Sequence, residues 1–351
     1  MSKSNVGGSL PDKIETVDEL EAVMSAPAPA VTEALGELDG DLVILGAGGK
    51  MGPSLARQAR RAMDEAGSKH RVIAVSRFGQ GGCREALQAH GIETLACDLL
   101  DPVAVASLPD AAAMVFMAGM KFGATAAASL TWAMNTYVPA LVGKRYAGVP
   151  TVVFSSGNVY PFMSVDGPGA SESTPPEPVG EYAQSVLGRE RIFEYFATAL
   201  GTPVLLFRLF YATELRYGIL HDVASKVLAG EPVALTMGHA NCIWQGDANG
   251  MALRSLALAS SPARCLNVTG PERCVVRDVA LQFGGRYGRS VAFEGKESDT
   301  ALVGDVTEAM RAFGPSTVSL DTLIHWVAHW VQHGGASLGK PTHFEVRDGQ
   351  F

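Results

Sequence analysis

The stretch that most constrains the fold is residues 42–52, where a short apolar run leads directly into a cluster of glycines. A helix-like pattern follows at once. A strand, a tight glycine turn and a helix N-terminus in this order expose backbone N–H groups and a helix dipole to an anion. The spacing of Gly46, Gly49 and Gly52 fits G-x-x-G-x-x-G, and Gly48 allows G-x-G as well. We therefore predict a turn that holds the pyrophosphate of a dinucleotide; glycines of a merely buried turn are the alternative.

The composition is that of a globular protein without a surface for nucleic acid. The chain has 351 residues, of which 47% are hydrophobic and 18% charged, and its formal net charge is −8. No block of lysine and arginine is present. Five cysteines without a C-x-x-C pair predict reduced thiols in a cytoplasmic protein. We find no apolar run long enough for a membrane-spanning helix and no apolar signal segment, so no membrane partner is expected.

From residue 41 onward, apolar runs alternate with helical patterns. We predict strands at 42–46, 72–76, 94–96, 113–117, 151–155 and 203–208, and helices near 17–24, 52–66, 83–90, 126–147 and 181–200. Strands separated by helices imply parallel pairing. The predicted fold is therefore α/β, a Rossmann-type doubly wound parallel sheet with a smaller C-terminal substrate-binding lobe. Ligands bind such sheets at the carboxyl ends of the strands.

The pattern changes after residue 208. We predict helices at 217–229, 247–260, 276–287 and 319–333, with short strands near 233–237 and 242–245. The expected organisation is an N-terminal extension at 1–38, a dinucleotide-binding domain at 39–215, a mainly substrate-binding lobe at 216–335 that is partly interleaved with it, and a tail at 336–351.

Further motifs follow the glycine turn in a characteristic order. They are Ser76-Arg77, Asp98-Leu99, Met117-Ala118-Gly119, Asn135-Thr136-Tyr137, Ser155-Ser156, Glu181-Tyr182, Phe210-Tyr211, Asn267 and Gly304-Asp305. Together they cover about residues 41–333. In this order the chain resembles the extended short-chain dehydrogenase/reductases, the NAD-dependent epimerase/dehydratase family.

The resemblance implies a role for each matched position. Residues implied to bind the cofactor are Gly46, Gly48, Gly49, Lys50, Met51 and Gly52 at the pyrophosphate, Asp98 and Leu99 at the adenine, Met117, Ala118 and Gly119 beyond the fourth strand, and Phe210 and Tyr211 at the nicotinamide amide. Ser156 would orient the reacting oxygen, and Tyr182 would be the acid/base while also lining the cofactor site. Lys121, Asn158 and Tyr160 would face the substrate. For Asp98 the structural alternative is a carboxylate that initiates the turn before Asp101.

The end of the second strand indicates which cofactor is used. A carboxylate that binds the adenine ribose is expected there, but Ser76 and Arg77 stand in its place. An arginine suits a 2′-phosphate, so we predict NADP rather than NAD. A solvated surface arginine is the alternative.

One element of the family pattern is missing. The pattern is Tyr-x-x-x-Lys, and Val186 occupies the position of the lysine after Tyr182. A free tyrosine has a pKa near 10, so only about one in a thousand is ionised at pH 7. Lowering that pKa by about 3 units requires roughly 4 kcal/mol, which a valine cannot supply. Lys121 and Glu181 are the substitutes that the sequence offers, and an ordinary loop residue is the alternative for each.

Three function classes follow. The first is an NAD(P)-dependent oxidoreductase or epimerase that acts on a polyhydroxylated, sugar-like or nucleotide-sugar substrate. The second is a dinucleotide-binding protein without redox turnover, used as a sensor or a partner subunit. The third is a lyase or dehydratase that retains its cofactor. Because few arginines of the smaller lobe could hold a second pyrophosphate, a small sugar or sugar acid is also a possible substrate.

The remaining candidates have simpler explanations. His325, His329 and His333 recur at helical spacing, but no acid completes a metal site, so we predict no metal. The family packs subunits through helices in the range 126–147, where Trp132 and Tyr137 lie, and this favours a homodimer; packing in the core would explain these aromatic residues equally well.

Overall fold

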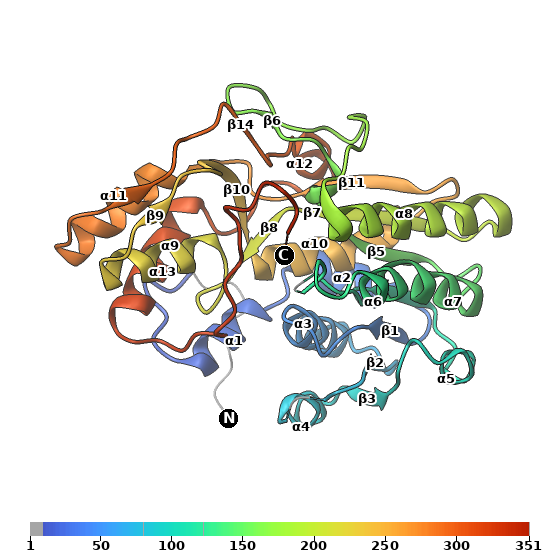
Figure 1. Ribbon diagram of the computed structural model, residues 1–351. Helices are drawn as coiled ribbons and strands as arrows, with labels where there is room; N and C mark the ends of the chain where they lie inside the picture. The colour runs from blue at the N-terminus through green and yellow to red at the C-terminus, as the bar shows by residue number, and fades with distance from the viewer. Residues whose placement is uncertain (1–9, 80, 122, 351) are drawn as a thin grey trace, which may run out of the picture.

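A sheet of seven parallel strands forms the centre of the computed structural model, which describes residues 10–79, 81–121 and 123–350 (Figure 1). The strand order is β11-β7-β5-β4-β1-β2-β3. The bounds are β1 Leu42–Leu45, β2 Val72–Ser76, β3 Glu93–Ala96, β4 Ala113–Phe116, β5 Thr151–Ser156, β7 Val204–Leu209 and β11 Arg264–Val268. All but β11 were predicted to within one residue at either end. The doubly wound α/β sheet is therefore confirmed, and its strand order reverses between β1 and β4.

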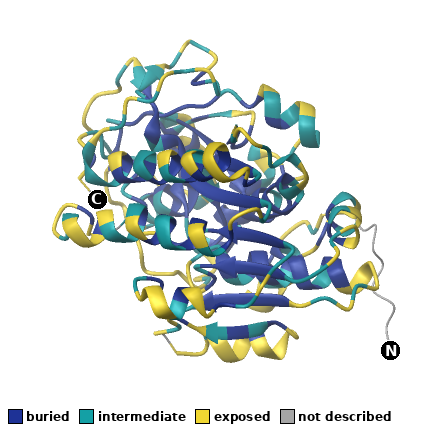
Figure 2. Cartoon of the chain, turned by 90° about the vertical axis from the view of Figure 1, so that its right-hand side faces the viewer, coloured by how far each residue is buried: buried dark blue, intermediate teal, exposed yellow. Residues whose placement is uncertain are grey.

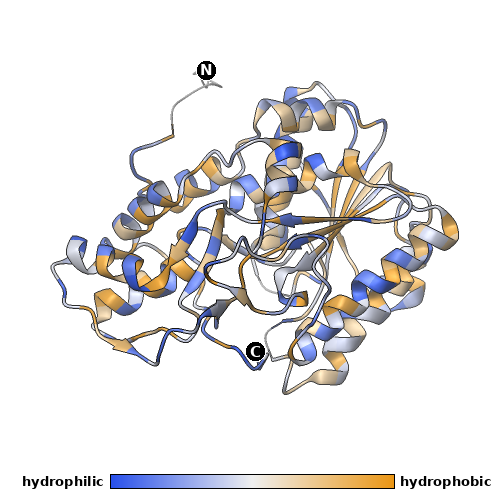
Figure 3. Cartoon of the chain, turned by 90° about the horizontal axis from the view of Figure 1, so that it is seen from above, coloured by the Kyte–Doolittle hydropathy of each residue, from blue (hydrophilic) through white to orange (hydrophobic). Residues whose placement is uncertain are grey.

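Helices cover both faces of this sheet, so the strands are buried on both sides (Figure 2). Leu42 and Ile44 face a layer formed by α2 (Pro29–Gly36), α3 (Gly52–Glu65) and α10 (Gln245–Arg254). Val43 and Leu45 face the opposite layer, which includes α7 (Val138–Arg145) and α8 (Gly180–Leu200). Burial on two faces explains why the strands read as continuous apolar runs, and they stand out as hydrophobic in Figure 3.

The predicted long helix at 126–147 is interrupted. It consists of α6 (Ala128–Trp132), a π-helical turn η1 (Ala133–Tyr137) and α7. Pro139 has no N–H to donate to the carbonyl of residue 135, which disfavours regular α-helical bonding at this point. The wider turn contains the buried side chain of Asn135, which reaches the loop after β4.

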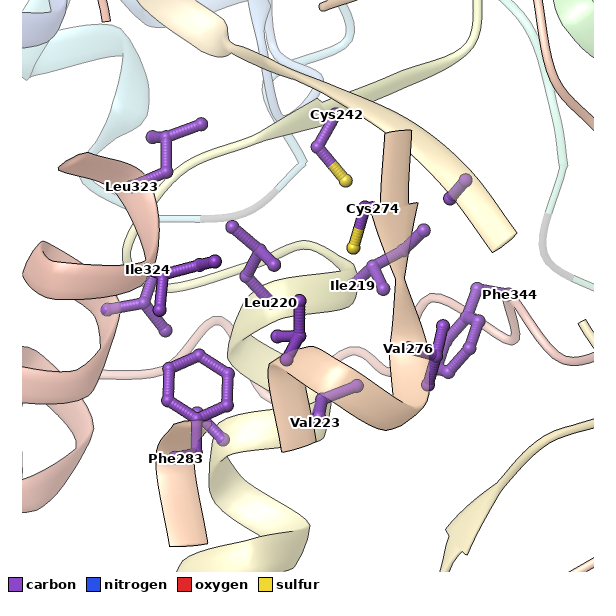
Figure 4. Packing of buried hydrophobic residues seen from close by; sticks show 14 of the residues in the cluster. Ile219, Leu220, Val223, Cys242, Cys274, Val276, Phe283, Leu323, Ile324 and Phe344 are labelled. Atoms are coloured by element: carbon purple, nitrogen blue, oxygen red, sulfur yellow. The ribbon is translucent and has the colours of Figure 1, made fainter. Parts of the chain in front are cut away.

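A smaller lobe stands beside the sheet, at the left of Figure 1. Its helices are α9 (Ile219–Ala229), α11 (Val276–Tyr287) and α13 (Leu320–Gln332). Its strands are β8 (Tyr211–Thr213), β9 (Val233–Ala234), β10 (His239–Trp244), β12 (Arg273–Val275) and β13 (Phe293–Glu294). A separate core holds the lobe together, with Cys242 and Cys274 near its centre (Figure 4). The predicted helix at 247–260 is shorter, because α10 ends at Arg254 and a 3-10 turn η3 (Ser255–Leu258) follows.

The remaining elements are short. They are α1 (Val17–Met24), α4 (Cys83–Ala89), α5 (Pro102–Ala106), η2 (Gly157–Val159), β6 (Met163–Ser164), β14 (Thr300–Ala301) and α12 (Thr307–Phe313). Two of them, α4 and α5, join consecutive strands of the large sheet. Helix α1 buries Leu20 and Met24 in the core of the smaller lobe, whereas α2 packs on α3 and α10. Strand β11 returns the chain from the smaller lobe to the large sheet, where Leu266 pairs with Phe207 of β7. The sequence did not predict this strand.

Candidate functional site

A cavity of about 270 Å³ opens at the carboxyl ends of β1, β4, β5 and β7, near the point where the strand order reverses. It is lined by thirteen residues that the sequence predicted for the site: Gly46, Gly49, Lys50, Met51, Gly52, Met117, Gly119, Lys121, Ser156, Asn158, Tyr182, Phe210 and Tyr211. The sequence did not identify eleven others: Met120, Phe154, Ser155, Arg189, Leu209, Ala212, Tyr217, Gly218, Ile219, Gln245 and Thr342. Elements from both parts of the molecule therefore form one site.

The glycine turn forms one wall of the cavity. Gly46 has a φ of +90°, and a Cβ there would lie 2.5 Å from the backbone nitrogen of Ala118. A Cβ at Gly52, the first residue of α3, would meet the carbonyl oxygen of Ala47 at 2.3 Å. Only glycine fits at these two positions, which keeps the backbone of the turn open beside a helix of 14 residues. A helix N-terminus in an open turn suits an anionic group such as a pyrophosphate.

Ser156 and Tyr182 form the opposite wall. Ser156 ends β5, accepts a hydrogen bond from the backbone N–H of Asn158 at 3.2 Å and donates to Oδ1 of the same residue at 2.9 Å. Tyr182 lies in the first turn of α8 and shares a side-chain hydrogen bond with Ser156. Burial raises the pKa of Tyr182, while the charge of Arg189 and the hydrogen bond with Ser156 oppose that rise. These two hydroxyls are therefore placed to act on the same oxygen of a bound molecule.

Val186 does not contribute to this wall. Its side chain is fully buried and packs with Val159, Tyr160 and Ala170. The position where the family pattern has its lysine is therefore part of an apolar cluster, and any positive charge beside Tyr182 must come from another residue.

Three cations line the cavity, and no carboxylate is among its lining residues, all of which lie in the described part of the chain. The Nζ of Lys50 lies 3.2 Å from the ring centroid of Tyr217, and that of Lys121 lies 5.7 Å from the ring centroid of Tyr182. Burial, with the charges of Lys121 and Lys340, lowers the pKa of Lys50 to about 7; burial lowers that of Lys121 to about 8. A cavity lined by basic side chains and by no carboxylate attracts anions.

Arg189 is the third cation, and the sequence analysis missed it. Its Nη1 donates to the carbonyl oxygen of Phe154 and its Nη2 to Oδ1 of Asn135, both at 2.6 Å. Burial lowers its pKa to about 10, although Tyr182 and Glu190 raise it. Arg189 follows Tyr182 by seven residues, which is two helical turns, so this spacing could have placed it on the same face.

Tyr160 lies outside the cavity of Tyr182. Its hydroxyl donates to Oδ1 of Asn267 at 2.8 Å and accepts from Nη1 of Arg208 at 2.6 Å. Arg208 also holds both carboxylate oxygens of Glu190, at 2.8 and 2.7 Å. The hydroxyl of Tyr160 is therefore committed to a buried network, and its contact with substrate remains a prediction.

Several predicted cofactor residues lie outside the cavity. They are Gly48, Ser76, Arg77, Asp98, Leu99 and Ala118. Arg77 is exposed at the end of β2, and the carboxylate of Asp98 accepts from the backbone N–H of Leu100 at 3.1 Å. Leu99 and Ala118 belong to the core on the α7–α8 face of the sheet. The adenine-binding role of Asp98 and Leu99 and the cofactor-binding roles of the other four residues remain predictions.

The other candidates lie away from the cavity or have partners. Glu181 accepts a hydrogen bond from Nε1 of Trp132. The rings of His329 and His333 are 4.1 Å apart. Within the described ranges, no three His, Cys, Asp or Glu side chains are grouped so that they could hold a metal ion. No helix in these ranges is both long and apolar enough to cross a bilayer.

Comparisons with known proteins agree with this architecture. Three solved structures resemble the chain, with a TM-score of 0.67 in each case: UDP-glucuronic acid 4-epimerase of Bacillus cereus, at 15% identity, a putative epimerase of Burkholderia cenocepacia, at 20%, and UDP-glucose 4-epimerase of Thermus thermophilus, at 17%. The first match covers 83% of this chain and 98% of the other, the second 84% and 98%, and the third 84% and 99%. At these identities the similarity concerns the fold.

Comparison with curated protein sequences gave no match. A sequence model of the NAD dependent epimerase/dehydratase family matches residues 42–251, which is more than half of the chain. The match begins at β1 and extends into α10, so it includes the glycine turn, Ser156 and Tyr182. The chain therefore belongs to the NAD dependent epimerase/dehydratase family.

Proposed function

We propose that this protein is a nicotinamide-dinucleotide-dependent oxidoreductase or epimerase that acts on a sugar-like substrate. The observation that carries the proposal is the shared cavity: the hydrogen-bonded pair of Ser156 and Tyr182 faces the same space as the glycine turn. An acid/base pair opposite a pyrophosphate-binding turn is the arrangement that hydride transfer at a hydroxyl-bearing carbon requires.

The residues of the turn fit a dinucleotide, because Gly46 and Gly52 let the turn pack against the backbone of Ala118 and Ala47 and leave the start of α3 open to the cavity. When bound, the nicotinamide would supply the hydride acceptor or donor. We assign the pyrophosphate to the turn and to Lys50, and the nicotinamide amide to Phe210 and Tyr211. NADP is the form we propose, since Arg77 is exposed at the end of β2 and can meet a 2′-phosphate.

Ser156 and Tyr182 would have different roles at the reacting oxygen. Ser156 would orient that oxygen by a hydrogen bond, and Tyr182 would take its proton through Oη during alcohol oxidation or return it during ketone reduction. A protonated Tyr182 can still donate to a developing alkoxide. Ketone reduction therefore depends less on a low pKa of Tyr182 than alcohol oxidation does.

The charges of the cavity favour an acidic substrate. Lys121 and Arg189 line it, and none of its lining residues is Asp or Glu. A carboxylate or phosphate on the substrate would compensate these charges. The similar structure from Bacillus cereus is named as an epimerase of UDP-glucuronic acid, which bears such a carboxylate. We propose a sugar acid, free or nucleotide-linked.

Titration followed by a turnover assay tests this function. NADPH and NADH fluorescence should report binding, with NADPH tighter; keto-sugars should then oxidise the reduced coenzyme, and sugar acids should reduce the oxidised coenzyme. Tyr182→Phe should bind coenzyme as the wild type does but lose turnover by a factor of about 100 or more. No binding of either nucleotide, oxidised or reduced, would contradict the proposal.

A second candidate rests on Val186. Without the lysine of the family pattern, the protein could bind a dinucleotide and not turn it over, as a sensor or a partner subunit. Coenzyme binding with neither an absorbance change nor an epimerised product across the substrate panel would favour this function over the first.

We also propose a homodimer. Leu130, Trp132 and Tyr137 are exposed together on α6 and η1, and light scattering of the purified chain would test the assembly.

A further inference from the structure

Val186 leaves Tyr182 without the usual cation, but α8 carries another one. Tyr182 and Arg189 are seven residues apart on this helix, which is nearly two full turns, so their side chains leave the same face. Both line the cavity. Arg189 therefore lies about one helical turn beyond position 186, where the family pattern has its lysine.

We propose that Arg189 is the positioning residue that replaces the missing lysine and stabilises the phenolate of Tyr182. This inference rests on the proposed function, in which Tyr182 is the acid/base. Arg189 acts through Tyr182 and leaves the reacting oxygen of the substrate to Ser156 and Tyr182.

The contacts of Arg189 hold it firmly without neutralising it. Both of its hydrogen-bond acceptors, the carbonyl of Phe154 and the side-chain amide of Asn135, are uncharged. Glu190 is adjacent in sequence, but Arg208 binds its two carboxylate oxygens. The Nε of Arg189 is buried and has no hydrogen-bond partner among the described residues. A buried cation without a bound carboxylate favours the ionised form of a neighbouring phenol.

The absence of a side chain at Gly119 also leaves space for the guanidinium of Arg189. A Cβ at Gly119 would lie 2.3 Å from Nη2 of Arg189 and 2.8 Å from Oδ1 of Asn135. Asn135 is fixed in turn, because it accepts from the backbone N–H of Met120 and donates to Oγ of Ser185. The loop after β4, the π-helical turn and α8 therefore jointly define the position of the charge.

Other charged and titratable groups face this region, but they are less suited to stabilising the phenolate of Tyr182. Lys121 approaches Tyr182 from the loop after β4, Tyr217 and Lys50 lie across the cavity, and Glu181 bonds to Trp132. The pKa of Lys121 is about 8, so this lysine loses its charge as the pH rises toward the range in which a tyrosine ionises. The pKa of Arg189 is about 10, so Arg189 keeps its charge to a higher pH than Lys121 does. The charge of Arg189 also opposes the rise in the pKa of Tyr182.

Carbon-13 NMR of Cζ-labelled tyrosine tests the inference without coenzyme or substrate. Tyr182→Phe identifies the resonance, and its pH titration gives the pKa of Tyr182 in the full-length protein. Arg189→Gln should raise that pKa by about 1 to 2 pH units, and Arg189→Lys should restore most of the difference. Arg191→Gln is the matched control, since Arg191 is exposed on the same helix and pairs with Glu194; it should leave the pKa unchanged.

Gly119→Ala provides a second route if Arg189→Gln does not fold. The added methyl group would displace the guanidinium without removing it, and the pKa of Tyr182 should again rise. An unchanged pKa of Tyr182 in either folded variant would overturn the inference. If the protein also proves to turn over substrate, the acid limb of the pH profile for alcohol oxidation should move upward with the NMR value. Because the titration needs no turnover, the inference about Arg189 can fail while the proposed function stands. Equally, the proposed function can fail while the inference about Arg189 stands.

Discussion

Lys50 is a half-buried lysine in the glycine turn that we propose binds the pyrophosphate. Its ammonium lies over the ring of Tyr217 at 3.2 Å from the centroid, a favourable cation–π distance. Burial nevertheless lowers its pKa to about 7, so in the free protein Lys50 is mostly neutral at pH 8. A bound pyrophosphate would favour the charged form and raise this pKa again. Coenzyme binding at Lys50 is therefore expected to be accompanied by the uptake of a proton.

We predict that binding of NADPH takes up protons, approaching about one per molecule at pH 8. The free protein must acquire the proton, so affinity should increase as the pH falls from about 9 to about 7, and level off below the pKa of the free state. Calorimetry in two buffers of different ionisation enthalpy measures the uptake.

Lys50→Met should weaken binding about tenfold and remove most of the uptake. Lys144→Met serves as the control, since Lys144 is exposed on α7. Equal proton uptake in the wild type and in Lys50→Met would contradict the assignment.

At the scale of elements, helix α8 is attached to the sheet by a buried ion pair. Glu190 is fully buried and Arg208 nearly so, and they connect α8 to β7 through two hydrogen bonds. Tyr160 and Asn267 extend the network to β11. The same helix carries Tyr182 and Arg189. The network therefore holds these two side chains in position as well as stabilising the fold.

Glu190→Gln should lower the free energy of unfolding by about 3 to 5 kcal/mol, because it leaves the charge of Arg208 buried without its partner. Urea denaturation measures this difference. On the same helix, Glu194→Gln breaks the exposed pair with Arg191 and should change stability by less than about 1 kcal/mol. Equal effects of the two substitutions would show that burial of the pair is not what stabilises α8.

At the scale of the whole molecule, the C-terminal segment links the smaller lobe to helix α8, which carries Tyr182. The backbone N–H and hydroxyl of Thr342 donate to Oδ2 of Asp222 in α9, and Thr342 lines the cavity. Arg347 donates to the carbonyl of Thr300 in β14. The segment then reaches Gly349, whose backbone packs on Gly180 at the start of α8.

Gly349→Ala should detach this segment from α8, because its Cβ would lie 2.3 Å from the carbonyl oxygen of Val179. Amide hydrogen exchange at residues 179–182 should become faster, and turnover should fall about tenfold as Tyr182 loses its position. Gly339→Ala is a close control: it has a similar positive φ, of +62° against +73°, but nothing within 4 Å of its Cβ. Unchanged exchange in Gly349→Ala would show that the contact does not order the helix.

Local patterns sufficed to predict most of the fold and the glycine turn of the cavity, and the family resemblance supplied the other predicted cavity residues. Strands buried on both faces must be apolar throughout, and a glycine turn between strand and helix needs glycine for steric reasons, so both features can be identified from a few consecutive residues. Strand β11 escaped detection because it is short and mixes polar and apolar residues, and its place depends on β7, about sixty residues earlier.

The surroundings of individual side chains depend on contacts between distant segments. Tyr160 occupies a motif beside Ser156, yet Asn267 and Arg208 take up its hydroxyl. Arg189 gains its place from Asn135, Phe154 and the space left at Gly119. The sequence pattern reveals which residues share a strand or a helix face, because backbone geometry sets the periodicity of side chains along strands and helices. Which charges are buried beside Tyr182 is decided by packing across the sheet, and packing exists only in the folded chain.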